Sequence, residues 1–495
     1  MRLVLLLIPL LAAGEVNFTS GPVVVANPNP RAPLAALVRF TAPQPVEALV
    51  TIKGGARPVE FRFAAKEHDP AKGLAVAGFR PGRSHTVEVS VWDPRRPARK
   101  AARTLSYTAP PLPAGANEIP PVRTRIPLPG RVEPGFTVLS VRRQAPGQLT
   151  DPSSIRYGML LGLDEAGEIV WYFRSGSRIS DFERTRRGTI LLCTLDYEIL
   201  EIDLLGTVLN RWYAAGRPQG KGEGVAVDTM TFHHEVDELP NGDIAVLGTS
   251  IREIDGYYTS ETDPAAPRRR QKVMGDQVVV FTREGKVVWK WDAFEHMDPM
   301  RIGYETFSGY WERRGFPGVV DWSHANNLLY DERGDSFLVS FRYQSAILRI
   351  SRKSGQIEWV LGRPEGWPAG LQDRLFKLAA GGRWFHHQHA PFPLASGTLL
   401  VFDNGNYQTM PFEKPLPPAM TYSRAAEYRI DGKSRTAAEL WESESGPGEE
   451  SVVSVAMGNA ERMPRTGNVL VSYGALLRRP FPATWDAGAG TWSRV

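Results

Sequence analysis

The chain has 495 residues, of which 42% are hydrophobic and 23% are charged, an ordinary globular composition that excludes a disordered or fibrous protein. The 59 Lys and Arg against 54 Asp and Glu leave a formal charge of +5, and no basic run is longer than the triplet at residues 268–270, so the charge gives no reason to expect nucleic acid. The single cysteine, Cys193, excludes an intramolecular disulfide and a cysteine-cluster metal site.

The first residues predict export. Met1 and Arg2 give a positive start, residues 3–11 are an apolar run, and residues 12–14 are small, which is the pattern of a secretory signal peptide over 1–14. The apolar run is about half the length needed to span a bilayer, so we expect no stable membrane anchor. The expected location is therefore periplasmic or secreted.

Two segments precede the main body of the chain. Residues 15–107 contain β-rich runs separated by turn residues, and the run from Gly78 to Trp92 is similar to the late strands of fibronectin-type sandwiches, so we expect a small β-sandwich domain there. Residues 108–130 are Pro-rich and are expected to form a linker.

Residues 131–495 carry two alternating repeat units. In one unit a Gly precedes a short apolar strand, and its copies lie at Gly188, Gly242, Gly334, Gly397 and Gly467. In the other a turn Gly leads to a Trp, and its copies lie at Gly167, Gly206, Gly285, Gly355 and, more loosely, Gly432. This alternation is typical of a β-propeller, so we expect an all-β fold with a six-bladed propeller over 131–495. The first Trp unit and the last Gly unit are expected to complete one blade between them.

Histidines recur at one position of the repeat. His234 lies eight residues before Gly242, His389 eight before Gly397, and His324 ten before Gly334. Asn459 lies eight residues before Gly467. Equivalent positions near the innermost strands converge on a propeller axis, so these four side chains are expected to face one another. His233, His386 and His387 are weaker members of the same group.

Several kinds of chemistry fit three imidazoles. They suit a transition metal, an anion, or a nucleophile with an acid–base partner. Arg342 ends the strand after His324, and a permanent cation suits an oxyanion better than a divalent metal. The set therefore favours sulfate or phosphate groups. A metal-dependent hydrolase or lyase, and a non-catalytic binding propeller, remain the alternatives.

At these residues the sequence resembles a known family. The segments "DWSHANN", "SFRYQ", "FHHEVDELPNGDIAVL" and "QHAPFPLASGTLLVFDNGN" are similar to those of bacterial arylsulfotransferases, the exported type that uses aryl sulfate esters instead of a nucleotide sulfate donor. The resemblance implies a small N-terminal β domain ahead of a six-bladed propeller. It also implies sulfuryl transfer from a phenolic sulfate ester to a phenol, by a ping-pong mechanism through a sulfohistidine.

The resemblance also implies roles for individual residues. His324 would be the nucleophile, Arg342 would hold the sulfuryl oxygens, and His234 and His389 would line the pocket and transfer protons. Asn326 matches a family position that contacts the site, whereas Asn459 rests on the repeat argument alone.

Partners and cofactors follow from the same reading. Aromatic residues near the motifs are expected to stack substrate rings, with packing in the sheet cores as the alternative: Phe232, Trp322, Tyr343, Phe385 and Tyr304. The expected partners are small aryl sulfates and phenols, with no metal, nucleotide or other cofactor and no nucleic acid. The resemblance suggests a homodimer.

Overall fold

The computed structural model describes residues 16–115, 118–126, 128, 130–143, 156–444, 446–448, 450–485 and 491–495. The fold is all-β, as predicted, with 32 strands and four short 3-10 helices in these ranges. The expected signal segment 1–14 lies outside the described residues. The chain divides into two compact units, of which the first comprises residues 1–139, 160–174 and 204–207 and the second the remaining residues.

The first unit contains a β-sandwich made of two antiparallel sheets. One sheet has the order β1-β2-β5 and the other β4-β3-β6-β7. Their bounds are β1 Ser20–Ala26, β2 Ala36–Thr41, β3 Glu47–Lys53, β4 Val59–Phe63, β5 Leu74–Val76, β6 Ser84–Trp92 and β7 Lys100–Thr108. Alternate residues such as Val87, Val89 and Val91 are fully buried between the sheets, which is the period-two pattern expected of half-buried strands.

A further sheet, β10-β9-β8, lies largely in the first unit. Its strands are β8 Thr137–Arg142, β9 Gly158–Leu163 and β10 Ile169–Ser175. The expected boundaries at residues 107 and 130 remain predictions.

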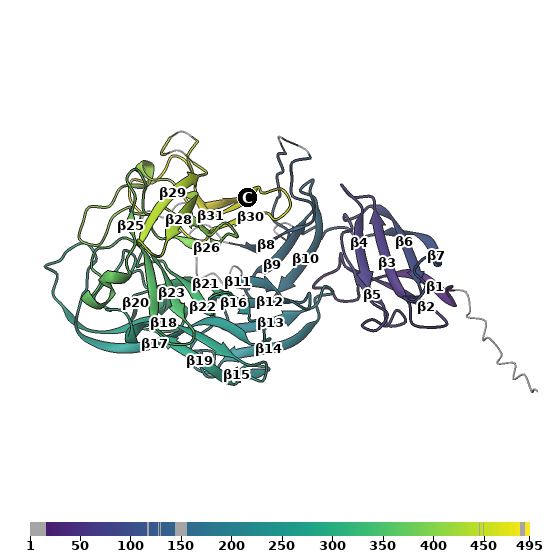
Figure 1. Ribbon diagram of the computed structural model, residues 1–495, viewed down its shortest axis with the longest axis horizontal. Helices are drawn as coiled ribbons and strands as arrows, with labels where there is room; N and C mark the ends of the chain where they lie inside the picture. The colour runs from purple at the N-terminus through teal and green to yellow at the C-terminus, as the bar shows by residue number, and fades with distance from the viewer. Residues whose placement is uncertain are drawn as a thin grey trace, which may run out of the picture. The chain divides into compact units, whose positions relative to one another are not determined.

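The second unit consists of five successive sheets (Figure 1). The first is β11 Ile179–Arg184, β12 Ile190–Thr194, β13 Glu198–Ile202, β14 Val208–Ala214 and β15 Val225–Val227. The second is β16 His233–Glu238, β17 Ile244–Tyr257, β18 Arg269–Phe281, β19 Val287–Asp292 and β20 Val319–Asp321. The third is β21 Ala325–Asp331, β22 Ser336–Phe341, β23 Ala346–Ser351 and β24 Ile357–Gly362. The fourth is β25 Lys377–Leu378, β26 His389–Pro393, β27 Thr398–Asp403, β28 Arg424–Asp431 and β29 Thr436–Glu442, and the fifth is β30 Asn459–Arg462, β31 Val469–Leu477 and β32 Thr491–Arg494. The 3-10 helices are η1 Ala293–Glu295, η2 Glu312–Arg314, η3 Ala369–Arg374 and η4 Pro418–Met420.

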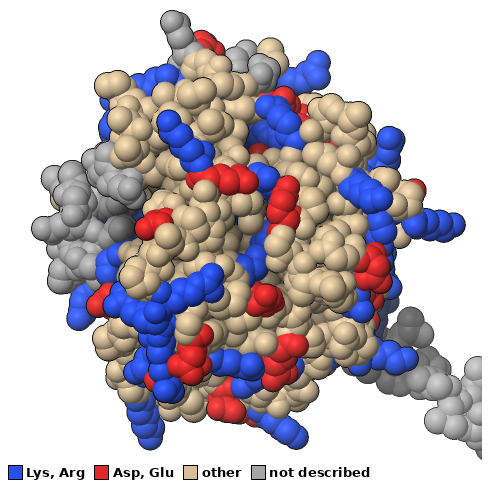
Figure 2. Space-filling model, turned by 90° about the vertical axis from the view of Figure 1, so that its left-hand side faces the viewer, with Lys and Arg blue, Asp and Glu red and all other residues tan. Residues whose placement is uncertain are grey.

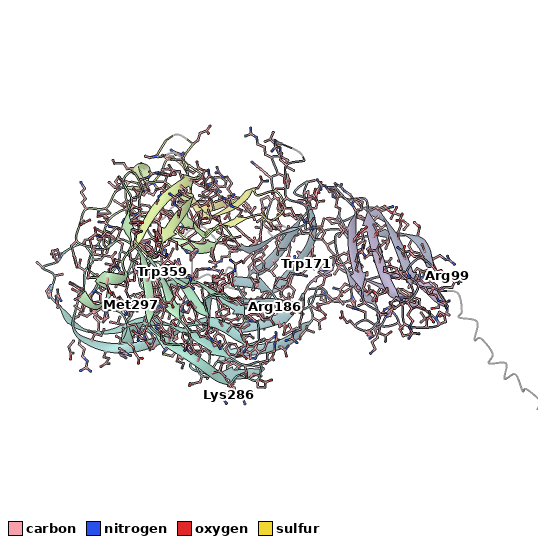
Figure 3. The ribbon with its side chains drawn as sticks, viewed as in Figure 1. Arg99, Trp171, Arg186, Lys286, Met297 and Trp359 are labelled. Atoms are coloured by element: carbon pink, nitrogen blue, oxygen red, sulfur yellow. The ribbon has the colours of Figure 1, made fainter. Side chains whose placement is uncertain are left out.

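The two repeat units correspond to two kinds of turn. The Gly units close the hairpins β11–β12, β16–β17, β21–β22, β26–β27 and β30–β31, and the Trp units close the hairpins β9–β10, β13–β14, β18–β19, β23–β24 and β28–β29. Three of the repeat tryptophans donate their indole N–H to a carbonyl in the corresponding turn of the next sheet: Trp171 to Leu204 at 3.0 Å, Trp212 to Arg283 at 2.8 Å and Trp291 to Gly355 at 2.9 Å. Trp171 and another repeat tryptophan, Trp359, are labelled in Figure 3. The Trp therefore recurs because it joins neighbouring sheets.

The sheets of the second unit pack face to face around their first strands. The contacts β11 with β16, β16 with β21, β21 with β26, and β26 with β30 follow chain order, and the labels of these strands cluster near the middle of the unit in Figure 1. Separate apolar cores lie between successive sheets. This arrangement confirms a propeller-like fold.

The two repeat halves at the chain ends do not share a sheet. Among the described residues, the Trp unit at Gly167 lies in the sheet β10-β9-β8, and the Gly unit at Gly467 lies in the sheet β30-β31-β32. The third strand is β8 in the first sheet and β32 in the second. The blade count of six remains a prediction.

The surface charges and the absence of long helices among the described residues complete the description. On the face shown in Figure 2, basic and acidic side chains are interspersed. Among the described residues, no helix is both long enough and apolar enough to cross a bilayer.

Candidate active site

The three histidine segments start the first strands of three successive sheets. His234 lies at the start of β16, His324 directly precedes β21, and His389 opens β26. In each sheet the pairing with the second strand shifts register at this point. His234 and His324 have positive φ angles of 57° and 47°, an uncommon backbone conformation for residues with a side chain. A bulge of this kind turns the strand and redirects the side chain.

The structure brings the three imidazoles together. The rings of His234 and His324 have their centroids 5.0 Å apart. His389 lies near both rings, because a charge on it would lower the pKa of His234 and a charge on His324 would lower the pKa of His389. His324 and His389 are only 6% and 7% exposed. The repeat position therefore places two buried imidazoles and one partly buried imidazole, that of His234, at one site.

These imidazoles are neutral at ordinary pH. Burial, together with the charge of His324, holds the pKa of His234 well below its usual range. Burial and the Arg342 guanidinium hold the pKa of His324 well below that range, and the same two causes lower the pKa of His389 to about 3. A neutral imidazole has one nitrogen with a free lone pair, so the tautomer decides which atom reacts.

The tautomer of His324 depends on Asp321, the last residue of β20. His324 Nδ1 lies 2.5 Å from Asp321 Oδ2, so in its ionised form the carboxylate accepts the Nδ1–H and leaves the Nε2 lone pair free. Burial raises the pKa of Asp321 to about 7. The pair can therefore change its protonation near neutral pH.

The tautomer of His389 depends on Asn404. His389 Nδ1 lies 2.6 Å from Asn404 Oδ1, and the Asn404 amide donates to the carbonyls of Ser454 at 3.0 Å and Met457 at 2.9 Å. These donations place the amide oxygen against the ring, so Nδ1 carries the proton and Nε2 is free.

His234 has the same tautomer through a histidine relay. His233 Nε2 lies 3.2 Å from Asp276 Oδ1 and 3.2 Å from the Gly248 carbonyl, both of which are acceptors. His233 Nδ1 therefore accepts the Nδ1–H of His234 across 2.9 Å. All three site imidazoles thus have a lone pair on Nε2, and His233 is a positioning residue.

Arg342 lies beside His324 but is held by an acid. Its backbone N–H donates to the His324 carbonyl at 3.0 Å. Its two Nη atoms donate to Glu305 at 2.5 and 3.3 Å, and Nη2 also donates to the Val455 carbonyl at 3.0 Å. Only Nε is buried without a partner among the described residues. A substrate oxyanion would meet Nε first or displace Glu305.

Two tyrosines enclose the His324 ring. Tyr343 stacks on it with centroids 4.4 Å apart, and Tyr310 meets it edge-on at 4.6 Å. His387 lies 5.8 Å from the Tyr343 ring. Tyr343 therefore lies at the site, as expected from its position in the sequence.

The remaining predicted residues lie at different depths. Asn326 is buried and donates to the Gln388 carbonyl at 2.7 Å, while its Oδ1 lacks a partner among the described residues. Phe232 stacks on Phe281 in an apolar core, and Trp322 donates to the Arg301 carbonyl from another core. Asn459 is exposed. The structure does not bring these last three into the imidazole cluster.

A cavity of about 310 Å³ opens beside the Glu305–Arg342 pair. Its lining includes residues 259–262, Glu305, Phe307, Ser308 and Tyr407. The Tyr407 hydroxyl donates to Glu305 at 3.2 Å, so Glu305 connects the cavity to Arg342. This volume is within the usual range for small-molecule sites.

The sequence did not predict four residues of the site: Asp321, Glu305, Tyr310 and Asn404. Asp321 lies three residues before His324 in "DWSH", and this short spacing was a usable signal. Glu305 and Tyr310 come from the long connection between β19 and β20 and carry no local signal. In the part of the chain that the structure describes, no group of three or more His, Cys, Asp or Glu is arranged to hold a metal ion.

Fold and site together define an all-β protein with a buried, neutral imidazole cluster beside a guanidinium. Residues 137–483 match the arylsulfotransferase (ASST) family, and the chain belongs to that family. The resemblance found in the histidine motifs is thereby confirmed.

Individual relatives cover smaller parts of the chain. The arylsulfate sulfotransferase AssT of Escherichia coli O6:H1 (strain CFT073) is 26% identical over 285 residues, which are 49% of this chain and 43% of that protein. AssT of Lelliottia amnigena is 25% identical over 250 residues, 41% of each chain. The match thus spans less than half the length of these curated relatives. Among solved structures, the WD40 β-propeller domain of Doa1 covers 68% of this chain and 93% of its own at 9% identity, and its TM-score of 0.29 is too low to support an argument.

Proposed function

We propose that the protein is an aryl-sulfate sulfotransferase, which moves a sulfuryl group from a phenolic sulfate ester to a phenol through a sulfohistidine intermediate. The observation that carries this proposal is the set of three neutral imidazoles, His234, His324 and His389, each with its Nε2 lone pair free. Membership of the arylsulfotransferase family supports the substrate class.

In the first half-reaction the Nε2 of His324 attacks sulfur. The N–S bond forms as the S–O bond to the aryl group breaks, and the departing phenolate takes the electron pair. A phenolate is a stable anion, which takes its proton from solvent. The ionised Asp321 stabilises the positive ring that results, because that ring donates Nδ1–H to it.

In the second half-reaction a phenol replaces the first product. Its proton passes to the free Nε2 of His234 or His389 and from there to solvent, its oxygen attacks sulfur, and the N–S bond returns its electron pair to the histidine. Charge on the sulfuryl oxygens is stabilised by Arg342, whose loss should cost about 100- to 1,000-fold in kcat, the usual effect of removing one such donor. The two half-reactions share one site and therefore predict ping-pong kinetics.

The test is the covalent intermediate. The enzyme is mixed with an aryl sulfate, quenched and digested, and the peptides are searched by mass spectrometry for one sulfuryl group that disappears after phenol is added. His324→Ala should abolish the labelled peptide, whereas His68→Ala, an exposed histidine of the first unit, should leave it intact.

His389 meets the same geometric requirement as His324, since its Nε2 is also free. A sulfuryl group mapped to the His389 peptide would assign the nucleophile to His389 and leave the reaction class unchanged. Absence of any labelled histidine during steady turnover would refute the sulfohistidine route. Stoichiometric zinc or iron in protein purified without a histidine tag would instead favour a metal-dependent hydrolase.

A further inference from the structure

Arg178 occupies the repeat position that His324 occupies two sheets later. Arg178 directly precedes β11, as His324 directly precedes β21. The Arg178 carbonyl accepts from Leu195 N–H at 2.9 Å, as the His324 carbonyl accepts from Arg342 N–H at 3.0 Å. In both sheets the pairing between the first and second strands shifts register at the start of the first strand. The topology therefore directs Arg178 toward the same inner region as the histidines.

The Arg178 guanidinium is buried without adequate partners. The residue is 5% exposed, and its Nε and one Nη have no hydrogen-bond partner among the described residues. Burying an unpaired cation is costly, so such a group usually has a ligand or a counter-ion.

Two further guanidiniums lie near it. Among the described residues, Arg142 makes a long hydrogen bond, 3.4 Å from its Nη2 to the Ser180 carbonyl. Burial, and after it the charge of Arg178, lower the pKa of Arg142 to about 10, and burial and the charge of Arg314 lower that of Arg178. Arg178 is buried and the other two are partly exposed, and three cations that repel one another at close range favour an anion between them.

Two acids act on this cluster, Asp181 on Arg142 and Asp321 on Arg314, and both make other contacts. The Asp181 charge acts on Arg142, but its carboxylate accepts from Val236 N–H at 3.1 Å and shares a hydrogen bond with Glu235. Burial raises the pKa of Asp181 to about 6, although the hydrogen bond with Glu235 acts in the opposite direction, and burial together with the Asp181 charge holds the pKa of Glu235 well above its usual range. Asp181 is therefore committed to its contacts with Val236 and Glu235 and makes no ion pair with the described arginines.

Tyr310 connects the cluster to the imidazole site. The Arg314 guanidinium carbon lies 3.6 Å from the Tyr310 ring centre, and that ring lies 4.6 Å from the His324 ring and 6.2 Å from the His234 ring. Arg314 is also among the charges that lower the pKa of His234. One aromatic ring therefore contacts both groups.

We propose that Arg142, Arg178 and Arg314 form an oxyanion-binding subsite beside the imidazoles, and that it binds an oxyanion group of the aryl substrate. The subsite itself follows from the geometry, and only the aryl nature of its ligand rests on the proposed function. The oxyanion has two sources: the sulfuryl group of the donor, or a second acidic substituent such as a carboxylate on the acceptor ring.

The first experiment measures binding without turnover. Sodium sulfate is titrated calorimetrically at constant ionic strength into the wild type, Arg178→Gln, and the matched control Arg184→Gln, which changes an exposed arginine at the far end of β11, the strand that Arg178 precedes. We expect at least a tenfold weaker affinity in Arg178→Gln and no change in Arg184→Gln. Unchanged sulfate affinity in Arg178→Gln, or no sulfate binding by the wild type, overturns the proposal.

A melting curve separates this role from a structural one. An unliganded cation destabilises the fold, so in sulfate-free buffer Arg178→Gln should melt at or above the wild-type Tm. A lower Tm would show that Arg178 is satisfied within the fold and would overturn the proposal. If Arg178→Gln does not fold, that outcome counts as the lower Tm, and Arg314→Gln gives the sulfate affinity.

Kinetics then identify the source of the oxyanion. Using phenyl sulfate as donor, KM is compared for phenol and 4-hydroxybenzoate as acceptors. In Arg178→Gln, a raised KM for the donor with both acceptors assigns the sulfuryl group, and a raised KM for 4-hydroxybenzoate alone assigns the acidic substituent. A protein that binds sulfate through Arg178 but transfers no sulfuryl group would refute the proposed function and leave the subsite standing.

Discussion

The free Nε2 atoms of His234, His324 and His389 result from what each Nδ1 contacts. A carboxylate, an amide oxygen and a second imidazole each accept the Nδ1–H of one ring. Burial disfavours a charged ring, and so does the repulsion between ionised imidazoles, since the centroids of His234 and His324 lie only 5.0 Å apart. The site therefore presents nucleophilic nitrogens without having to remove a proton first.

Asp321 should control the reactivity of His324. In Asp321→Asn the amide no longer demands the Nδ1–H tautomer or stabilises a positive ring, so kcat should fall by about 100-fold or more. Steady-state kinetics with an aryl sulfate and phenol measure this change. A variant with wild-type kcat would show that the 2.5 Å contact has no role in catalysis.

The same carboxyl should set the acid side of the pH profile. The pKa of Asp321 is raised to about 7 by burial, so the active ionised form is present above this pH and is lost as the pH falls through it. The imidazoles do not contribute here, because the pKa of His389, for example, is lowered to about 3. We expect log kcat/KM to decline below pH 7 in the wild type and this limb to vanish in Asp321→Asn. An identical acid limb in both proteins would contradict the assignment.

The hairpins that build each sheet depend on turn glycines with positive φ. Gly242 and Gly285 have φ angles of 86° and 85°. A Cβ at Gly242 would meet nothing within 4 Å, whereas a Cβ at Gly285 would lie 2.7 Å from the Ala226 carbonyl oxygen. The backbone cost is similar at both turns, but only Gly285 adds a clash.

Alanine substitutions at these two turns should therefore differ. Gly242→Ala should lose about 1 to 2 kcal/mol from the left-handed backbone alone. Gly285→Ala should lose a further 1 to 3 kcal/mol, roughly the cost of overpacking. Urea unfolding followed by tryptophan fluorescence compares them, and equal losses would show that the Gly285 turn relaxes freely.

At the scale of the whole molecule, each compact unit has its own apolar core. The sandwich core includes Phe40, Val50 and Val89, and none of its residues belongs to the cores between the sheets of the second unit. All residues of the imidazole site lie in the second unit. Binding at the site should therefore stabilise that unit alone.

Calorimetry should resolve this difference. We expect two unfolding transitions, of which only one moves to higher temperature as sodium sulfate is added, because a ligand stabilises the unit that binds it. Sodium chloride at equal ionic strength is the control. A single transition, or an equal shift of both, would show that the two units unfold together.

Much of the fold was predictable because it rests on local patterns. The Gly units and Trp units mark hairpin turns, and turn chemistry is set by a few adjacent residues. Among the described residues the two end units lie in separate sheets, so the shared end blade remains a prediction, and the third strands β8 and β32 have little repeat character of their own.

The histidine cluster was predictable for a related reason. Equal spacing from a turn Gly gives His234 and His389 equal places on a strand, and the fold then superposes those places. Asn459 has the same spacing but is exposed, because spacing fixes a position along the strand and not the direction of its side chain.

The sequence by itself therefore determined the all-β class, the repeat, the family and the imidazoles that meet. Only the tertiary structure decided which groups face them: Asp321, Asn404, Glu305 and the arginines around Tyr310. Periodicity is a property of neighbouring residues, whereas these contacts join distant loops whose approach depends on the packing of whole sheets. Tautomer, charge and ligand preference all follow from that packing.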